Sequence, residues 1–198
     1  LYRAVNTIRD RFGFYHAGIF LIDQRQEYAV LRAATGEAGR ELLRQEHQLK
    51  IGKVGVVGYV AESGEQRVAS DVGKDQVHFK NPLLPETRSE AALPLAIANV
   101  GRQGQRVIGV LDVQSEETDA FDEESLATLQ IVADQLAIAI QNARLFEESQ
   151  ESLRELEATY RQINQQAWQR MLRSNRVVGY QYDGISATPI YKTSLPAE

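Results

Sequence analysis

One stretch of this sequence limits the possible folds more than any other, because neither glycine nor proline occurs between Asp122 and Gly179. Asp122 is a residue type that favours the N-cap of a helix, and Glu123 and Glu124 follow it, where carboxylates interact favourably with the helix dipole. The pattern predicts a helix from Glu123 to about Arg173, roughly 75 Å long at 1.5 Å per residue. A small domain cannot cover a helix of that length along its whole course.

The second half of this predicted helix carries a narrow apolar stripe with alternating spacings of three and four residues. Such a stripe is typical of a coiled-coil seam, so we expect a second copy of the chain to pair there. The predicted dimer interface consists of Leu153, Leu156, Tyr160, Ile163 and Ala167. The first half is more broadly apolar and is expected to pack on its own domain. The heptad phase changes near Gln150, which marks the junction between the two halves.

Composition excludes several classes of function. Apolar residues make up 43% and charged residues 25% of the 198 residues, a balance typical of a water-soluble domain with an extension. No apolar run approaches the roughly 20 residues of a membrane span. The 22 basic residues are scattered among 27 acidic ones, which argues against a nucleic-acid surface. Because the chain begins at Leu1 rather than Met, we interpret it as a piece of a longer protein.

The sequence contains no cysteine. Disulfides, thiolate metal sites and thioether-linked chromophores are therefore excluded for this chain. The absence fits a reducing compartment, and we expect a cytoplasmic location. The three histidines show no metal-ligand spacing, and no combination of residues suggests a catalytic site, so we expect neither a metal centre nor catalysis.

Upstream of the long helix the pattern predicts one helix and a set of strands. Residues 1–12 have helical spacing and are followed by Gly13, a favourable C-cap residue. The segment 14–22 is apolar on both alternating faces, which indicates a central strand covered on both sides. The other predicted strands are 27–34, 49–51, 67–70, 91–98 and 106–114, the last two joined by a turn at 99–105.

The remaining segments are less regular. A looser region is expected from Gly36 to Gly39. Residues 52–61 lack the spacing of a phosphate-binding loop and predict a turn that leads into a short helix packed closely through Gly58. Residues 72–88 contain two prolines and little periodicity, and a loop of this length inside a small domain is often a binding lid.

Several motifs in order carry a family resemblance. They are the segments 14–23, 52–60 with Asp71 and Val72, 88–95, 107–115, 133–136 and 142–146. Together they resemble a GAF domain over residues 1–148, most closely the GAF domains of multidomain bacterial sensor proteins such as histidine kinases. The resemblance implies an α+β fold: a central antiparallel sheet with the terminal helices on one face and a ligand pocket on the other. The predicted division is 1–148 as sensory domain, 149–175 as coiled-coil signalling helix, and 176–198 as a hairpin, a disordered tail or, as we favour, the start of a truncated following domain.

The resemblance also implies a function. Family members bind cyclic nucleotides, bilins, haem or small metabolites, form homodimers, and pass a change through the exit helix to an output domain. Here the N-K-x-n-F-x-D-E motif of the cyclic-nucleotide binders is absent. Without cysteine, neither covalent bilin attachment nor the methionine-sulfoxide-reducing branch of the family fits, and haem is not expected. The ligand therefore stays unidentified, and two functions remain open: a sensory module that binds a small molecule, or a ligand-free dimerisation and relay module.

Three candidate ligand contacts come from the strand at 14–22 and the long loop. His16 lies on a mostly apolar strand, where it would either face a ligand or form a hydrogen bond in the core. His78 and Phe79 lie in the loop that the family places over the pocket. His47 lies in a polar segment and is expected at the surface.

Three further candidates flank this loop. Asp71 is at a position where bilin-binding relatives have an aspartate facing the pocket, and its alternative role is to form a turn. Arg88 and Glu90 lie at the start of the strand that follows. They would either pair with each other, which we favour, or Arg88 would reach an anionic ligand.

Overall fold

A six-stranded antiparallel sheet forms the centre of the first part of the chain. The computed structural model describes residues 1–98, 104–173 and 177–191 and divides the chain into two units, Leu1–Asn142 and Ala143–Glu198. The sheet has the order β3-β2-β1-β6-β5-β4. Its strands are β1 (His16–Ile22), β2 (Tyr28–Ala34), β3 (Gln48–Lys50), β4 (Arg67–Ala69), β5 (Ser89–Ala98) and β6 (Gln105–Ser115). The expected antiparallel α+β fold and the central position of the first strand are confirmed.

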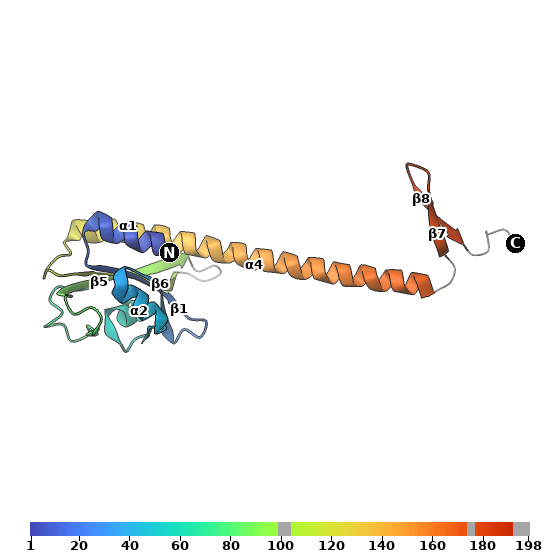
Figure 1. Ribbon diagram of the computed structural model, residues 1–198. Coiled ribbons are helices and arrows are strands. Elements are labelled where there is room, and N and C mark those ends of the chain that lie inside the picture. The colour runs from blue at the N-terminus through green and yellow to red at the C-terminus, as the bar shows by residue number, and fades with distance from the viewer. Residues whose placement is uncertain (99–103, 174–176, 192–198) are drawn as a thin grey trace. The chain divides into compact units, whose positions relative to one another are not determined.

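The helices cover the sheet on both faces (Figure 1). On one face, α1 (Tyr2–Phe12) and the beginning of α4 (Glu123–Arg173) enclose one hydrophobic core. On the other face, α2 (Gly36–Arg44) and α3 (Gly55–Ser63) enclose a second core. The two cores contain alternate residues of the same strands: Ile19 and Leu111 belong to the first, and Phe20 and Val110 to the second. The terminal helices therefore lie on one face, as the resemblance implied.

The prediction of a looser region from Gly36 to Gly39 is wrong, because residues 36–44 form the helix α2. Gly36 adopts a φ of 73° at the start of this helix, a conformation that glycine accepts without strain. Gly39 packs directly on Ala34, where a side chain would come within 2.7 Å of the Ala34 Cβ. Although glycine usually destabilises a helix, Gly36 allows the chain to enter α2 and Gly39 allows α2 to pack closely on Ala34.

The short helix after Gly52 is confirmed as α3, and so is its close packing through Gly58. A Cβ at Gly58 would lie 2.7 Å from the Lys50 carbonyl oxygen. This contact brings the start of α3 against the end of β3, and both elements border the pocket described below.

The long helix α4 is confirmed from Glu123 to Arg173. The Asp122 carboxylate accepts a hydrogen bond from the Ser125 N–H at 2.8 Å, which is the predicted N-cap. Leu129, Ala133 and Ala137 are buried against the sheet, whereas the side chains that the structure describes after Ala143 are mostly exposed. None of the described helices is both long and apolar enough to cross a lipid bilayer.

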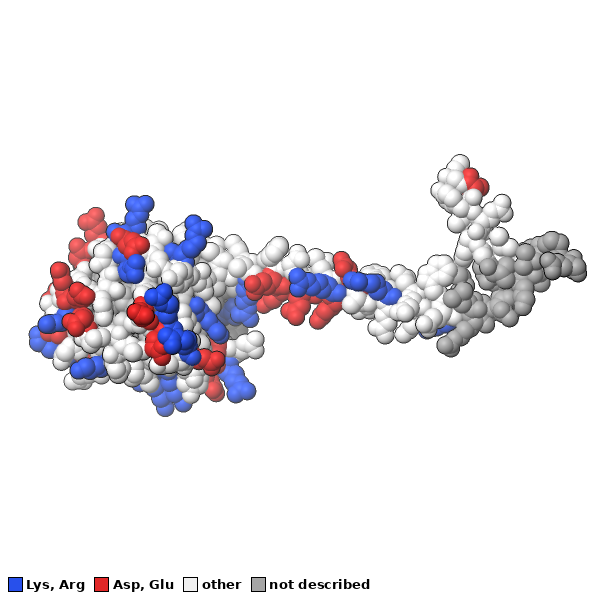
Figure 2. All heavy atoms as spheres, viewed as in Figure 1, with Lys and Arg blue, Asp and Glu red and all other residues white. Residues whose placement is uncertain are grey.

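The second unit also contains a hairpin formed by β7 (Val177–Tyr182) and β8 (Ala187–Tyr191). This hairpin fits both a lone hairpin and the favoured start of a following domain, so the assignment of residues 176–198 stays a prediction. Residues 99–103 of the turn predicted at 99–105 lie outside the described residues. On the first unit, acidic and basic side chains are intermixed over the face shown in Figure 2.

Candidate functional site

A small pocket lies on the sheet face that carries α2 and α3. It has a volume of about 20 Å³, which is room for about one water molecule. The 72–88 loop contributes Phe79, Asn81 and Leu84, so this loop forms one wall of the pocket. The lining combines apolar and polar side chains, and His47 lies beside the apolar Phe20 and Phe79. The apolar residues are Phe20, Leu31, Leu42, Leu49, Val57, Phe79 and Leu84, and the polar ones are His16, His47, Asn81, Glu90, Asp112 and Gln114.

Much of the polar lining arises from the alternation of side chains along three neighbouring strands. On β6, Asp112 and Gln114 continue the row that begins with Val110, so they face the same side of the sheet as the second core. Gln114 pairs with Glu90 of β5 on one side and with His16 of β1 on the other. The strand register therefore places four polar side chains together on an otherwise apolar face.

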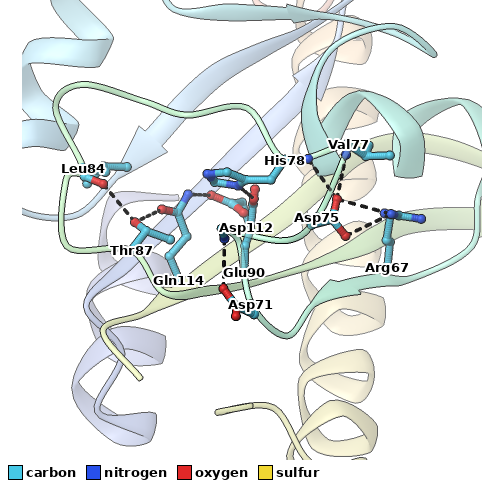
Figure 3. Close-up of polar contacts among 11 residues, drawn as sticks. Arg67, Asp71, Asp75, Val77, His78, Leu84, Thr87, Glu90, Asp112 and Gln114 are labelled. Carbon is cyan, nitrogen blue, oxygen red and sulfur yellow. Dashed lines mark hydrogen bonds and ion pairs between the residues drawn. The ribbon is translucent and has the colours of Figure 1, made fainter. Parts of the chain in front are cut away.

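Three of these side chains, Glu90, Asp112 and Gln114, form a network with residues of the loop (Figure 3). His78 Nδ1 lies 2.5 Å from Glu90 Oε2, and Gln114 Nε2 donates to Asp112 Oδ2 at 2.8 Å. The Thr87 hydroxyl donates to Gln114 Oε1 at 2.7 Å. Two loop residues thus contact polar groups of the sheet directly, and the loop cannot move away without breaking these contacts.

An ion pair fixes the loop segment that carries His78. Asp75 Oδ2 lies 3.0 Å from the Arg67 guanidinium, and Asp75 Oδ1 accepts hydrogen bonds from the N–H groups of Val77 and His78. Burial works against the charge of Asp75, but these hydrogen bonds and Arg67 keep its pKa below the ordinary value. The Arg67 guanidinium also stacks on the Tyr59 ring at 5.1 Å. Arg67 therefore links β4, α3 and the loop.

Two buried carboxyl groups dominate the electrostatics of the site. Glu90 is 5% and Asp112 is 2% exposed. Burial raises the pKa of Glu90 to about 7. Burial, together with the charge of the neighbouring Glu90, raises the pKa of Asp112 well above its ordinary range. Asp112 Oδ1 receives no N–H or O–H from other described residues, and a proton on either carboxyl forms a hydrogen bond between Glu90 and Asp112. The pair is therefore built to hold a proton near neutral pH.

The histidines around this pair are held in the neutral form. Burial lowers the pKa of His16 to about 4, and the nearby Arg9 charge acts in the same direction. His16 Nδ1 lies 3.3 Å from the Thr35 hydroxyl, which itself accepts a hydrogen bond from the Ala17 N–H. Burial also lowers the pKa of His78, although Asp112 and Asp75 oppose this shift. The site thus supplies hydrogen-bond donors and acceptors without a fixed positive charge.

The structure brings four of the six predicted ligand contacts together. His16, Phe79 and Glu90 line the pocket, and His78 contacts Glu90. Asp71 is not among the lining residues. Its carboxylate bonds Lys74 at 2.7 Å and the Gly73 N–H at 3.0 Å, which matches the alternative role in a turn.

Arg88 is also absent from the pocket lining, and its side chain is exposed. The favoured pairing of Arg88 with Glu90 is wrong, because Glu90 is buried and pairs with His78. Arg88 instead lies close enough to Asp71 to favour the charge of that carboxylate.

Reasoning from sequence missed four polar lining residues: His47, Asn81, Asp112 and Gln114. His47 was expected at the surface, but it is half-buried, with its ring centroid 6.2 Å from those of Phe20 and Phe79. The signal for Asp112 and Gln114 was present, since two polar residues occupy alternate positions in an apolar strand. Nothing comparable marks His47, because only the tertiary fold brings it to the pocket.

Comparison with known proteins decides the family. The family model described as "GAF domain" matches residues 1–141, which is more than half of the chain. The chain belongs to the GAF-domain family. A GAF domain-containing protein A from Dictyostelium discoideum is 30% identical over 117 residues, a match that covers 59% of this chain and 64% of that protein. The chain thus spans less than two thirds of the length of this relative.

Solved structures agree with the GAF fold. The GAF domain of a phosphoenolpyruvate-protein phosphotransferase from Coxiella burnetii has a TM-score of 0.63 at 25% identity, covering 75% of this chain and 84% of that chain. A free methionine-R-sulfoxide reductase from Neisseria meningitidis, solved in complex with its substrate, has a TM-score of 0.59 at 26% identity, with 73% and 78% covered. GAF domains are typically regulatory, yet these neighbours include an enzyme.

Proposed function

We propose that this GAF domain is a non-catalytic sensory module that binds a small molecule in the pocket beneath the 72–88 loop. The observation that carries the proposal is the burial of two neighbouring carboxyl groups, Glu90 and Asp112, in the lining of the pocket. Burial of ionisable groups without full compensation costs free energy. A domain that only relayed motion would be more stable with apolar side chains at these positions, so their presence favours a binding role.

Ligand entry requires movement of the loop, because the pocket as it stands has room for about one water molecule. The described 72–88 segment contains neither helix nor strand. Phe79 closes the pocket from this segment while remaining 41% exposed. The loop can therefore open by breaking side-chain contacts alone, which is the usual behaviour of an active-site or binding-site lid.

The small volume also favours a second candidate, a ligand-free module for dimerisation and relay. In that case the pocket is filled by its own side chains, and no ligand stabilises the domain. The buried pair of Glu90 and Asp112 speaks against this alternative, because burying two neighbouring carboxyl groups costs free energy that an apolar interior avoids.

The non-catalytic role rests on the absence of cysteine from all 198 residues. The resemblance implied that the sulfoxide-reducing relatives need catalytic cysteines, so similarity to the Neisseria reductase extends to the fold but not to that chemistry. Reduction of free methionine sulfoxide by the purified chain would contradict this part of the proposal.

For the relay we propose a homodimer through α4. The predicted seam residues Leu153, Leu156, Tyr160 and Ile163 are each more than half exposed. Exposed apolar side chains also continue toward the start of the helix, and they are Ile131, Ile138, Leu145 and Phe146. A second copy would cover both sets. By the family resemblance, the parent protein would be a cytoplasmic sensor, such as a bacterial histidine kinase, whose output domain receives the change.

A thermal-stability screen against a metabolite library tests the ligand-binding role. At least one compound is expected to raise the melting temperature, since a ligand that binds only the folded state stabilises it by mass action. Phe79→Ala should weaken this stabilisation several-fold, because it removes the aromatic wall of the pocket. The matched control is Lys80→Ala, a neighbouring exposed residue that does not line the pocket. A library without any stabilising compound would favour the ligand-free relay.

A further inference from the structure

The exposed apolar stripe of α4 extends further toward the start of the helix than the seam predicted from sequence. Phe146 is 65% exposed and lies seven residues before Leu153, the first residue of that seam. Residues seven apart lie on the same face of a helix that pairs in a coiled coil, so Phe146 belongs to the same stripe. From Phe146 to Ala167 the stripe covers about three heptads, or about 32 Å of α4 at 1.5 Å per residue.

Two polar residues lie on the same face as the stripe, near its beginning. Ser149 lies seven residues before Leu156, and Asn142 lies seven residues before Ser149. Both side chains are exposed, and neither makes a hydrogen bond with any residue in the described part of the chain. By contrast, the hydroxyls of Ser152 and Thr159 donate to carbonyl oxygens of α4 one turn earlier. The side chains of Asn142 and Ser149 are therefore available for hydrogen bonds across an interface.

The positions that flank the stripe are almost free of charge. Among residues 143–167, Glu157 is the only charged residue at a flanking position, and it lies 3.6 Å from Arg161 of the next turn. The other charged residues of this segment occupy the outer positions of the heptad, and they are Arg144, Glu147, Glu148, Glu151, Arg154, Glu155 and Arg161. A second helix can therefore cover the stripe without burying these charges. The flanks also lack the charge pairs that select between a parallel and an antiparallel partner.

The order of polar and apolar residues along the stripe makes this selection instead. In a parallel pair in register, each residue of the stripe meets the same residue of the second copy, so Asn142 meets Asn142 and Ser149 meets Ser149. In an antiparallel pair over the same stripe, Ser149 faces Tyr160 and Asn142 faces Ala167. The antiparallel pair buries the Asn142 amide against an apolar side chain, which costs free energy.

We propose that α4 pairs with α4 of a second copy in parallel and in register, and that Asn142 selects this orientation through a hydrogen bond between the two Asn142 amides. The inference rests on the proposed homodimer, and it names the orientation of the pair and the residue that selects it. An asparagine amide carries both a donor and an acceptor, so two copies of it satisfy each other. A polar residue in an apolar seam specifies register at a cost in stability. The C-terminal ends of α4 in both copies then lie at the same end of the pair.

The absence of cysteine from the chain allows a single substitution to report the orientation. Ser149→Cys places one thiol in the stripe, and a parallel pair in register brings the two thiols within reach of a disulfide. In a glutathione redox buffer, most of this variant should form covalent dimers on a denaturing gel without reductant. Glu151→Cys is the matched control, because residue 151 is also exposed but lies on the outer face of the helix. It should link only a small fraction of the protein.

Asn142→Leu, introduced into the Ser149→Cys protein, tests the role of Asn142. An apolar residue at this position should lower the dissociation constant of the dimer several-fold, because the cost of the polar layer is removed. The yield of covalent dimer should nevertheless fall about twofold, because antiparallel pairs are no longer disfavoured. Gln162→Leu in the same protein adds the same side chain on the outer face of α4 and should change neither quantity.

Sedimentation of the same proteins distinguishes failure of this inference from failure of the homodimer. A dimer in which Ser149→Cys does not link, or links no better than Glu151→Cys, would overturn the parallel register while the homodimer stood. An Asn142→Leu variant that dimerises more weakly, or that keeps the full yield of covalent dimer, would overturn the role of Asn142. A chain that stays monomeric at concentrations where the seam should pair would contradict both the homodimer and its orientation.

Discussion

The unmodified protein is expected to lose roughly 2–3 kcal/mol of its free energy of unfolding between pH 5 and 8, and the Glu90→Gln variant should not show this loss. Burial raises the pKa of Glu90 from 4.5 to about 7, so the folded protein keeps a proton that the unfolded chain releases. The stabilisation from that proton is fully present below pH 4.5 and is lost as the pH rises through 7. A pKa rise of this size corresponds to about 3 kcal/mol in total, and the glutamine variant avoids the loss.

The free energy of unfolding has to be compared between the variant and the unmodified protein, because the contribution of His16 to stability changes with pH in the opposite direction to that of Glu90. Burial lowers the pKa of His16 to about 4, so its contribution to stability is present above pH 6.5 and is lost as the pH falls through 4. In the unmodified protein, the two effects oppose each other between about pH 4 and 7. His16 is present in both proteins, and its effect therefore cancels in the difference.

Urea denaturation of both proteins at several pH values measures this difference. Asp71→Asn is the control, because a hydrogen bond from Lys74 lowers the pKa of Asp71 and its titration lies below the range tested. That variant should follow the unmodified protein from pH 5 to 8. A constant difference between Glu90→Gln and the unmodified protein over this range would show that Glu90 does not titrate as a buried carboxyl.

The second large effect concerns the dimer. Ile163→Glu is expected to weaken self-association by about 100-fold, or roughly 3 kcal/mol, because it places a charge in the predicted seam of both copies. Ile163 is 55% exposed in the single chain, so the change should leave the fold of the monomer intact. Analytical ultracentrifugation over a range of concentrations gives the dissociation constant.

Gln165→Glu is the matched control for this variant. Position 165 lies between Ile163 and Ala167 in sequence but outside the predicted seam spacing, and its side chain is exposed. The same charge is therefore added to the same turn of α4 on a different face. Equal weakening by both substitutions would indicate general charge repulsion, and no weakening by Ile163→Glu would remove the seam from the interface.

Much of the fold could be predicted from sequence because local patterns determine it. The apolar faces of β1, the cap at Asp122 and the absence of helix breakers after it are local signals, and the structure agrees with each. The helix α2 was missed because Gly36 and Gly39 resemble helix breakers. Their role depends on a positive φ and on contact with Ala34, which only the tertiary fold reveals.

The site was harder to predict, because its residues come from different strands and only the register of the sheet brings them side by side. Loop position and residue type were enough to select His78 and Phe79. Asp112 stayed unnoticed because its importance comes from pairing in space with Glu90, which lies on the neighbouring strand. Asp71 was selected by family resemblance, yet its carboxylate bonds Lys74 and the local backbone in a turn.

Native mass spectrometry of the protein purified from cells most directly tests whether this GAF module is a dimeric small-molecule sensor. The expected spectrum shows two copies of the 22.2 kDa chain with the added mass of one small molecule per copy. The Asp112→Asn variant should lose the added mass and keep the dimer. A single chain without any added mass, at concentrations where the seam should pair, would contradict both the sensor and its relay.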